Sequence, residues 1–192
     1  NPVTATKSEL RAQVRAARAS RGADARKQAQ QQLTLELLKL VAGQGARRIA
    51  AFLPTDTEPP IAEFLELTHY QGVEILVPRV VDESSMTWVL YHPDHDQVRS
   101  FLGVPEIAET TGLTTEDALP RLDLVLVPAA AVDSHGMRLG WGKGYYDRAL
   151  SAGAHPPVYA VVFDDEVVDE VPSERHDQPV DGVVTPSGTR VF

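Results

Sequence analysis

The sequence predicts a single α/β domain of three layers, in which helices cover both faces of a mostly parallel sheet. Short, almost continuous aliphatic runs such as 122–127 and 158–162 are typical of strands buried on both faces of a parallel sheet. These runs alternate with longer amphipathic segments, and 192 residues suffice for one sizeable core. No internal repeat, low-complexity tract or long charge run marks a domain boundary in the sequence.

Composition and charge limit the possible partners. The chain is 43% hydrophobic and 23% charged, as is ordinary for a globular protein, and its net charge is −9. Because there is no basic excess to neutralise phosphates, we expect no nucleic-acid or membrane partner, and any anion site has to be locally basic. The absence of cysteine excludes disulfides and thiolate metal sites. The polar start and the lack of about 18 consecutive apolar residues lead us to expect a soluble, cytoplasmic protein, and we expect a monomer.

The first predicted helix covers residues 8–20. Its apolar stripe, at helical spacing, consists of Leu10, Val14 and Ala17. Beside the stripe, four cations share one edge of the helix: Lys7, Arg11, Arg15 and Arg18. Such a row is usually a solvated basic face, and we expect Arg15 and Arg18 to face solvent.

Two further helices and a strand follow. Asp24 can cap a helix that ends at Gly43 and Gly45 and whose apolar face consists of Leu33, Leu37, Leu38, Leu40 and Val41. The short apolar run 48–53 ends at Pro54 and predicts a buried strand. Pro59 and Pro60 then open a helix that is buried through Ile61, Phe64 and Leu65. The loop between this strand and helix is a place where α/β folds bind ligands.

The rest of the chain continues the alternation. We predict strands at 74–78, 87–91, 122–127, 158–162 and 182–184, a helix at 145–152, and a helical or turn segment at 164–170. The loop around His92, Asp94, His95 and Asp96 resembles a metal cluster in composition only. We expect no metal there, because polar turns often combine these residue types and no supporting ligand pattern lies nearby.

The segment 133–148 is the most informative part of the sequence. It lies between the strand-like run 122–127 and a predicted helix, and it carries four glycines and three cations: Gly136, Gly140, Gly142, Gly144, Arg138, Lys143 and Arg148. Glycine backbone with cations at the start of a helix suits a polyphosphate. The spacing matches neither a P-loop, since Gly144 follows Lys143, nor the dinucleotide fingerprint. For the glycines alone, a simple turn between strand and helix is an equally good interpretation.

The full run from Arg138 to Arg148, RLGWGKGYYDR, is more specific than its glycines. It resembles the signature of the 5-formyltetrahydrofolate cyclo-ligases, also called methenyltetrahydrofolate synthetases. Two other segments resemble the same family: KSELR at 7–11 and HDQPVD at 176–181. The match at 103–107 is partial, because Ile107 replaces a proline. The family usually has a glycine and a Phe-Asp pair in the region where this chain has Ala129, Ala130 and Val132, and the chain keeps the aspartate as Asp133.

The resemblance implies an enzyme that uses ATP and Mg²⁺ to convert 5-formyltetrahydrofolate to 5,10-methenyltetrahydrofolate, and it implies that Arg138 and Lys143 are catalytic. The implied ATP-binding residues are Lys7, Ser8, Glu9, Leu10 and Arg11, together with Arg138, Leu139, Gly140, Trp141, Gly142, Lys143, Gly144, Tyr145 and Tyr146. The implied folate-binding residues are Leu53, Glu58, Trp141, Gly142, Lys143, Gly144 and Tyr145, with Leu102 as a possible lining of the pterin side. The implied Mg²⁺ ligands are Asp147 and Asp177.

Simpler interpretations remain open for single residues. Glu58 and Asp147 could each stabilise the start of a helix, and Asp177 could organise a turn. A nucleotide- or folate-binding module without activity would keep the glycines but could lose the metal carboxylates. A phosphosugar isomerase or acyltransferase would need a carboxylate beside a carbonyl substrate and no ATP.

Overall fold

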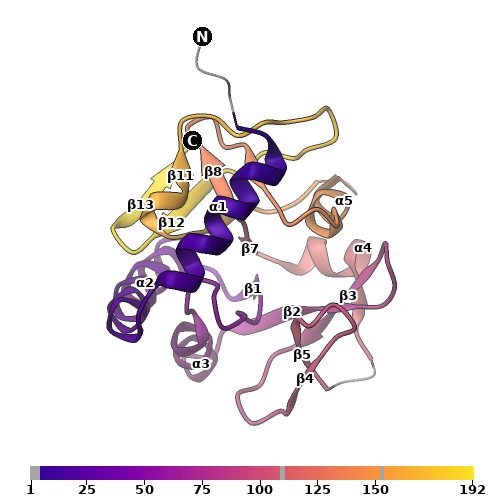
Figure 1. Cartoon of the computed structure of the whole chain (residues 1–192). Coiled ribbons are helices and arrows are strands. Elements are labelled where there is room, and N and C mark those ends of the chain that lie inside the picture. The colour runs from indigo at the N-terminus through magenta and orange to yellow at the C-terminus, as the bar shows by residue number, and fades with distance from the viewer. Residues whose placement is uncertain (1–4, 109–110, 152–153) are drawn as a thin grey trace.

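The computed structural model describes residues 5–108, 111–151 and 154–192 and has three layers around a central sheet (Figure 1). Within these residues the central sheet has eight strands in the order β13-β12-β10-β7-β1-β2-β3-β6. Their bounds are β1 Arg48–Ala50, β2 Glu74–Val80, β3 Met86–Leu90, β6 Leu113–Thr114, β7 Leu124–Pro128, β10 Val158–Val161, β12 Gly182–Thr185 and β13 Gly188–Val191.

The five central strands, from β12 to β2, pair in parallel. Antiparallel pairs extend the sheet at both edges, with β13 on β12 at one side and with β3 and β6 beyond β2 at the other. The prediction of a mostly parallel sheet is thus confirmed for its centre. The edge strands β6 and β13 were not predicted, because runs of two to four mixed residues carry almost no periodicity.

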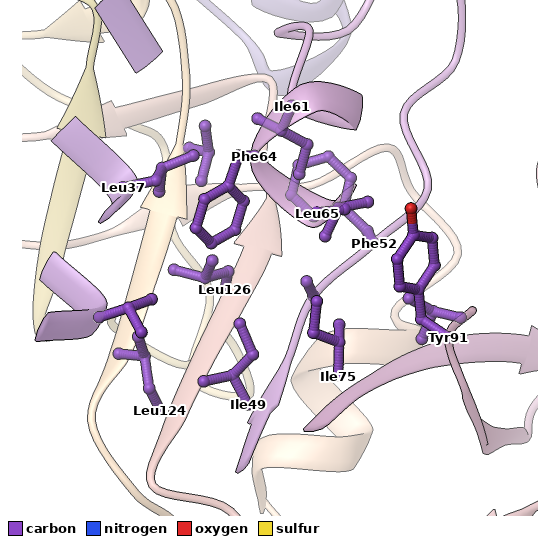
Figure 2. Close-up of a cluster of buried hydrophobic side chains, with 14 of the residues drawn as sticks. Leu37, Ile49, Phe52, Ile61, Phe64, Leu65, Ile75, Tyr91, Leu124 and Leu126 are labelled. Carbon is purple, nitrogen blue, oxygen red and sulfur yellow. The ribbon is translucent and has the colours of Figure 1, made fainter. Parts of the chain in front are cut away.

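Alternate residues of each central strand face opposite layers, as the pleat of a strand requires. Leu124 and Leu126 of β7 join one apolar cluster, whereas Val125 and Val127 join the other. The helices α2, Ala23–Gly43, and α3, Ala62–Tyr70, cover the first cluster. Figure 2 shows Phe64 of α3 in this layer, above Leu126 and among aliphatic side chains. The second cluster lies under α4, Thr115–Ala118, the short helix η1, Leu119–Arg121, and α5, Tyr145–Ser151.

The first helix packs against a second, small sheet. This sheet has the order β11-β8-β9, with β8 Ala131–Asp133, β9 Arg138–Leu139 and β11 Val167–Val168, the last preceded by the short helix η2, Asp164–Glu166. Helix α1, Lys7–Ser20, crosses in front of β8 in Figure 1. Its Val14 packs with Ala130, Ala131 and Leu139 of this region. The β8–β9 hairpin was not predicted. The Asp133 carboxylate forms it by accepting hydrogen bonds from the backbone N–H groups of His135 and Met137, at 2.9 and 3.0 Å.

Three sequence predictions need correction. Arg18 does not face solvent: it is buried and pairs with Glu166. Helix α2 begins after Gly22, so Asp24 lies in its first turn and is not its cap. The first strand is shorter than 48–53, although the Ala51 N–H still donates to Leu76 O at 2.9 Å.

Two other regions bear on the predictions. The segment after β3 forms a hairpin of β4, Gln97–Arg99, and β5, Pro105–Ile107, whose Ile107 is buried in the first apolar cluster. Val132, another departure from the family pattern, is fully buried in the second cluster, so Ile107 and Val132 both affect packing. In the described part of the chain no group of three or more His, Cys, Asp or Glu side chains could hold a metal ion, the loop at His92 included. None of the helices in the same part is long and apolar enough to cross a membrane.

The packing of α3 predicts a large loss of stability on truncation of its central side chain. Phe64→Ala removes a fully buried ring, and we expect the free energy of unfolding to fall by about 3–5 kcal/mol. Urea denaturation followed by circular dichroism measures this change. The matched control Leu67→Ala, on the same helix but 40% exposed, should cost far less, and equal losses for the two variants would contradict the packing described.

Candidate active site

A cleft of about 1070 Å³ opens at the carboxyl ends of the parallel strands. Phe52 and Leu53 follow β1, Val80 ends β2 and Pro128 ends β7, and all four line the cleft. The other walls come from α1, the segment 102–106, the glycine-rich segment and the turn 174–178. The carboxyl edge of a parallel sheet is where α/β folds place their ligands.

Most residues predicted for the site lie together in this cleft. The predicted residues that line it are Lys7, Arg11, Leu53, Glu58, Leu102, Arg138, Leu139, Gly140, Trp141, Gly142, Lys143, Gly144, Tyr145, Tyr146, Asp147 and Asp177. Three predicted residues of α1 do not line it. Ser8 and Glu9 are exposed, and Leu10 packs against the small sheet. Only the cations of the 7–11 segment therefore reach the cleft.

Two hydrogen bonds connect the start of α1 to distant parts of the chain. Thr6 caps the helix by accepting from the Glu9 N–H, which sets the direction in which its first turn points. Lys7 Nζ then donates to Asp177 Oδ2 at 2.8 Å, and Arg11 Nε donates to the carbonyl oxygen of Gly140 at 2.8 Å. The basic edge of α1 thus meets the glycine-rich segment and the 174–178 turn.

Glycine is required in the segment itself. Gly142 and Gly144 have φ values of 98° and 72°, a region that residues with a Cβ rarely adopt. A Cβ on Gly140 would lie 3.2 Å from the Arg138 guanidinium, so this glycine also allows the arginine to come close to the backbone. Because these three glycines have no Cβ, cationic side chains and backbone N–H groups can lie close together in one short loop.

Arg138 is a buried cation with an unused donor. Its Nη1 donates to Pro128 O at 2.7 Å, its Nη2 lies 3.8 Å from Asp147 Oδ1, and its guanidinium carbon lies 5.6 Å from the centre of the Tyr146 ring. Its Nε is buried without a hydrogen-bond partner. Burial lowers the pKa of Arg138, whereas Asp147 raises it. A buried donor without a partner is costly, so an anionic ligand that accepts from it would relieve that cost.

Lys143 and Trp141 occupy the outer part of the loop. Lys143 is exposed, so its ammonium group is free to move towards a ligand. The Trp141 ring contacts two guanidinium groups of α1, Arg15 at 4.9 Å and Arg18 at 5.4 Å from the ring centre. Arg15 is exposed, as predicted, but both arginines line the cleft, which the sequence analysis did not predict.

The two predicted metal ligands lie on neighbouring segments of one wall. Asp147 Oδ1 accepts from the Gln178 N–H at 3.1 Å, which brings α5 next to the residue that follows Asp177. Asp177 Oδ2 also accepts from the Glu174 N–H at 2.8 Å. Burial raises the pKa of Asp177, but these hydrogen bonds from Lys7 and Glu174 outweigh it and lower the pKa overall. Two carboxylates on one wall of the cleft fit Mg²⁺, which takes few protein oxygens and keeps its waters.

Two carboxyl groups lie on the apolar side of the cleft. Glu58 Oε1 accepts from the Thr55 N–H at 2.8 Å, and burial raises the pKa of Glu58, although this hydrogen bond and, less strongly, Arg18 oppose the shift. Glu106 is buried and accepts from the Val80 N–H at 2.6 Å through Oε2. Glu106 was not predicted as a site residue, although it belongs to the partial family match at 103–107, which was the available signal.

Comparison with known proteins decides the family. Residues 3–186 match the 5-formyltetrahydrofolate cyclo-ligase family. The chain belongs to this family. A cyclo-ligase of Mycolicibacterium smegmatis is 36% identical over 152 residues, which cover 73% of this chain and 74% of the relative. A cyclo-ligase of Escherichia coli K12 is 32% identical over 148 residues, covering 74% and 79%.

Solved structures agree with the family assignment. The structure of Aquifex aeolicus 5,10-methenyltetrahydrofolate synthetase superposes with a TM-score of 0.78 at 27% identity, covering 96% of this chain and 92% of that one. A synthetase from Mycoplasma pneumoniae, at 19% identity, has a TM-score of 0.74 and supports the fold. The three-layer α/β architecture of this cyclo-ligase is therefore that of the family.

The raised pKa of Glu58 predicts a stability change that depends on pH. A carboxyl group whose pKa is higher in the folded than in the unfolded state lowers the free energy of unfolding as pH rises above the unfolded-state pKa. The reason is that the group ionises more easily in the unfolded chain. We expect Glu58→Gln to raise the free energy of unfolding by about 1 kcal/mol at pH 8, and by much less at pH 4. Urea denaturation at both pH values measures the difference. Glu66→Gln, at an exposed position of α3, is the control, and equal behaviour of the two variants would contradict the prediction.

Proposed function

We propose that this protein converts 5-formyltetrahydrofolate and ATP to 5,10-methenyltetrahydrofolate, ADP and phosphate, with Mg²⁺. The observation that carries the proposal is that one cleft gathers three distant motifs of the family: the cations of α1, the glycine-rich segment and Asp177. A phosphate site and an apolar wall share this cleft. A reaction between a nucleotide and a pterin needs both.

The oxygen of the formyl group on N5 is a poor leaving group, and its phosphorylation turns it into a good one. The formyl oxygen attacks the γ-phosphorus of ATP, and the bond from phosphorus to the ADP oxygen breaks. N10 then attacks the formyl carbon and loses its proton, the carbon–oxygen bond breaks and phosphate leaves. Such a transfer requires little covalent chemistry of the protein, so positioning and charge neutralisation dominate its catalytic role.

The phosphates fit the basic side of the cleft. Arg11 lies over the glycine-rich loop, Arg138 offers its unpaired Nε, and Lys143 is free to follow the charge as it moves. Backbone N–H groups of the loop, Gly140 to Gly144, add uncharged donors, and α5 begins directly after them. In this arrangement Arg138 is already fixed before a ligand arrives, which is the property of an effective electrostatic catalyst.

The pterin fits the part of the cleft that Leu53 and Glu58 line, together with aromatic side chains of the segment 141–145. Leu53, Trp141 and Tyr145 offer apolar and aromatic surface for the ring. The carboxyl group of Glu58 can hydrogen-bond to the amino and ring N–H groups of a pterin. The raised pKa of Glu58 means that its charged form is disfavoured in the empty cleft. A ligand that donates a hydrogen bond to this carboxylate stabilises the charged form.

Asp147 and Asp177 are the residues that would hold Mg²⁺. When bound, Mg²⁺ would neutralise part of the charge on the phosphates of ATP. Both carboxylates line the cleft, and each lies near a cation of the chain: Asp177 near Lys7, Asp147 near Arg138. A metal ion would share these carboxylates with the two cations, Lys7 and Arg138.

The alternative of a binding module without activity is less well supported. Such a module would need the glycine loop but neither carboxylate, and both carboxylates face the same cleft. An isomerase or acyltransferase is disfavoured by the basic phosphate side and by membership of the cyclo-ligase family.

The direct test is the reaction. We expect the absorbance of methenyltetrahydrofolate to appear when purified protein and 5-formyltetrahydrofolate are mixed with Mg-ATP, and not when ATP or Mg²⁺ is left out. Folding is verified by circular dichroism in the same sample. A folded protein that forms no product at saturating Mg-ATP would refute the proposal.

Charge neutralisation predicts a loss of turnover at the loop lysine. We expect Lys143→Ala to lower kcat on the order of 10²-fold, because it removes a cation that meets charge developing during transfer, with little change in folate binding. Steady-state kinetics with both substrates varied measure this. Lys27→Ala removes an exposed lysine of α2 outside the cleft and should leave kcat unchanged. Similar kcat values for Lys143→Ala and the parent would exclude a catalytic lysine here.

The metal assignment predicts a changed Mg²⁺ dependence. Asp147→Asn removes one anionic ligand, so we expect the Mg²⁺ concentration for half-maximal rate to rise about tenfold, while folate affinity without nucleotide stays the same. Asp117→Asn, at an exposed position of α4, serves as the control. If Asp147→Asn keeps the parent's Mg²⁺ dependence but melts at a clearly lower temperature, Asp147 has a structural role only.

A further inference from the structure

A buried ion pair contains one of the arginines that line the cleft. Arg18 Nε donates to Glu166 Oε2 at 2.8 Å and Arg18 Nη2 donates to Glu166 Oε1 at 2.9 Å, and the two side chains are only 2% and 3% exposed. Arg18 Nη2 also donates to Ala129 O at 2.9 Å, and Glu166 Oε1 accepts from the Phe163 N–H at 2.9 Å. The pair therefore joins α1 to the residue after β7 and to the segment that follows β10.

The same arginine contacts the glycine-rich loop. Its guanidinium carbon lies 5.4 Å from the centre of the Trp141 ring and 5.8 Å from that of Phe163. Arg11, about two helical turns earlier on α1, donates to Gly140 O at 2.8 Å. One helix thus contacts neighbouring loop residues at two points, through the Gly140 backbone and through the Trp141 ring.

The energetics of the pair argue against a role in stability alone. Burying two charges costs as much as their attraction returns, and apolar pairs of similar size are often no less stable. What the pair supplies is geometry. A guanidinium held by two bonds to Glu166 and one to Ala129 has little freedom, so the aromatic ring beside it also has a defined position.

We propose that the Arg18–Glu166 pair is a positioning device that holds Trp141, and with it the loop 140–144, in the geometry that binds the nucleotide. Arg18 and Glu166 act through Trp141 and are not catalytic residues. The part of this inference that concerns ATP rests on the proposed function, whereas the part that concerns Trp141 does not.

The test uses a variant that removes both charges together. Arg18→Met with Glu166→Gln leaves no unpaired buried charge, and the glutamine oxygen can still accept from the Phe163 N–H. The sequence has two tryptophans, and Trp88 is buried on β3, so Trp88→Phe in every protein leaves Trp141 as the single reporter. Arg21→Met is the matched control, because Arg21 also pairs with an acid of η2, Asp165 at 3.2 Å, and its guanidinium carbon lies 3.6 Å from the centre of the Phe163 ring.

Two results are expected from the double variant. Without ligand, acrylamide should quench Trp141 more strongly than in the Trp88→Phe parent, because the ring has lost its fixed neighbour. In the enzyme assay, KM for ATP should rise about tenfold with kcat nearly unchanged, since binding of substrate and transition state weaken alike. The Arg21→Met control should match the parent in both measurements.

Arg18→Lys is the second variant, for the case in which the double variant does not fold. Lysine keeps the charge opposite Glu166 but cannot hold a planar group beside the ring while bonding to Glu166 and Ala129, so Trp141 quenching should also increase. Parent-like quenching and parent-like KM for ATP in the folded variants would overturn the inference. A parent that shows no ATP-dependent activity would refute the proposed function instead, and the quenching result in the ligand-free protein would still decide whether the pair positions Trp141.

Discussion

The docking of α1 across the small sheet is the constraint on which the site depends. The carboxyl ends of the parallel strands form one edge of the central sheet, and the cleft opens there. Helix α1 closes one side of this cleft, although it packs on the small sheet and on neither face of the central sheet. Val14 holds the helix against Ala130, Ala131 and Leu139, and its cations reach the loop and the 174–178 turn. Without this docking, the glycine-rich segment would be a surface turn with a row of unpaired cations.

The charged side chains that line the cleft are mainly basic, although the chain as a whole is acidic. The protein has a net charge of −9, yet seven Lys and Arg side chains line the cleft against five Asp and Glu: Lys7, Arg11, Arg15, Arg18, Arg138, Lys143 and Arg148, and Glu58, Glu106, Asp147, Glu174 and Asp177. Any anion site of this chain was expected to be locally basic, and the lining of the cleft is basic. Because several of these cations are anchored by hydrogen bonds to the protein, little rearrangement is needed to receive an anion.

The sequence predicted the elements with strong periodicity and missed what depends on tertiary contacts. The aliphatic runs of β7 and β10 and the leucine face of α2 carry clear patterns, and all three are confirmed. The β8–β9 hairpin depends on one Asp133 carboxylate and has no pattern of its own. Arg18 shares an edge of α1 with Arg15, and no periodicity distinguishes them. Glu166, a partner far away in the sequence, makes Arg18 a buried residue. The motif residues in the cleft could be listed from the family resemblance, whereas Ser8, Glu9 and Leu10 point elsewhere because only one edge of a helix can face a cleft.

The contacts of α1 have a consequence for the order in which the protein is built. Lys7, Arg11 and Arg18 bond to partners 170, 129 and 148 positions further along the chain. During synthesis α1 therefore emerges from the ribosome well before any of these partners exists, and its basic edge stays solvated until residues 140–177 have been made. Strands β1, β2 and β7 can pair earlier, since all three precede the residues that α1 needs. The wall of the cleft that α1 forms is thus assembled only after residues 140–177 have been made.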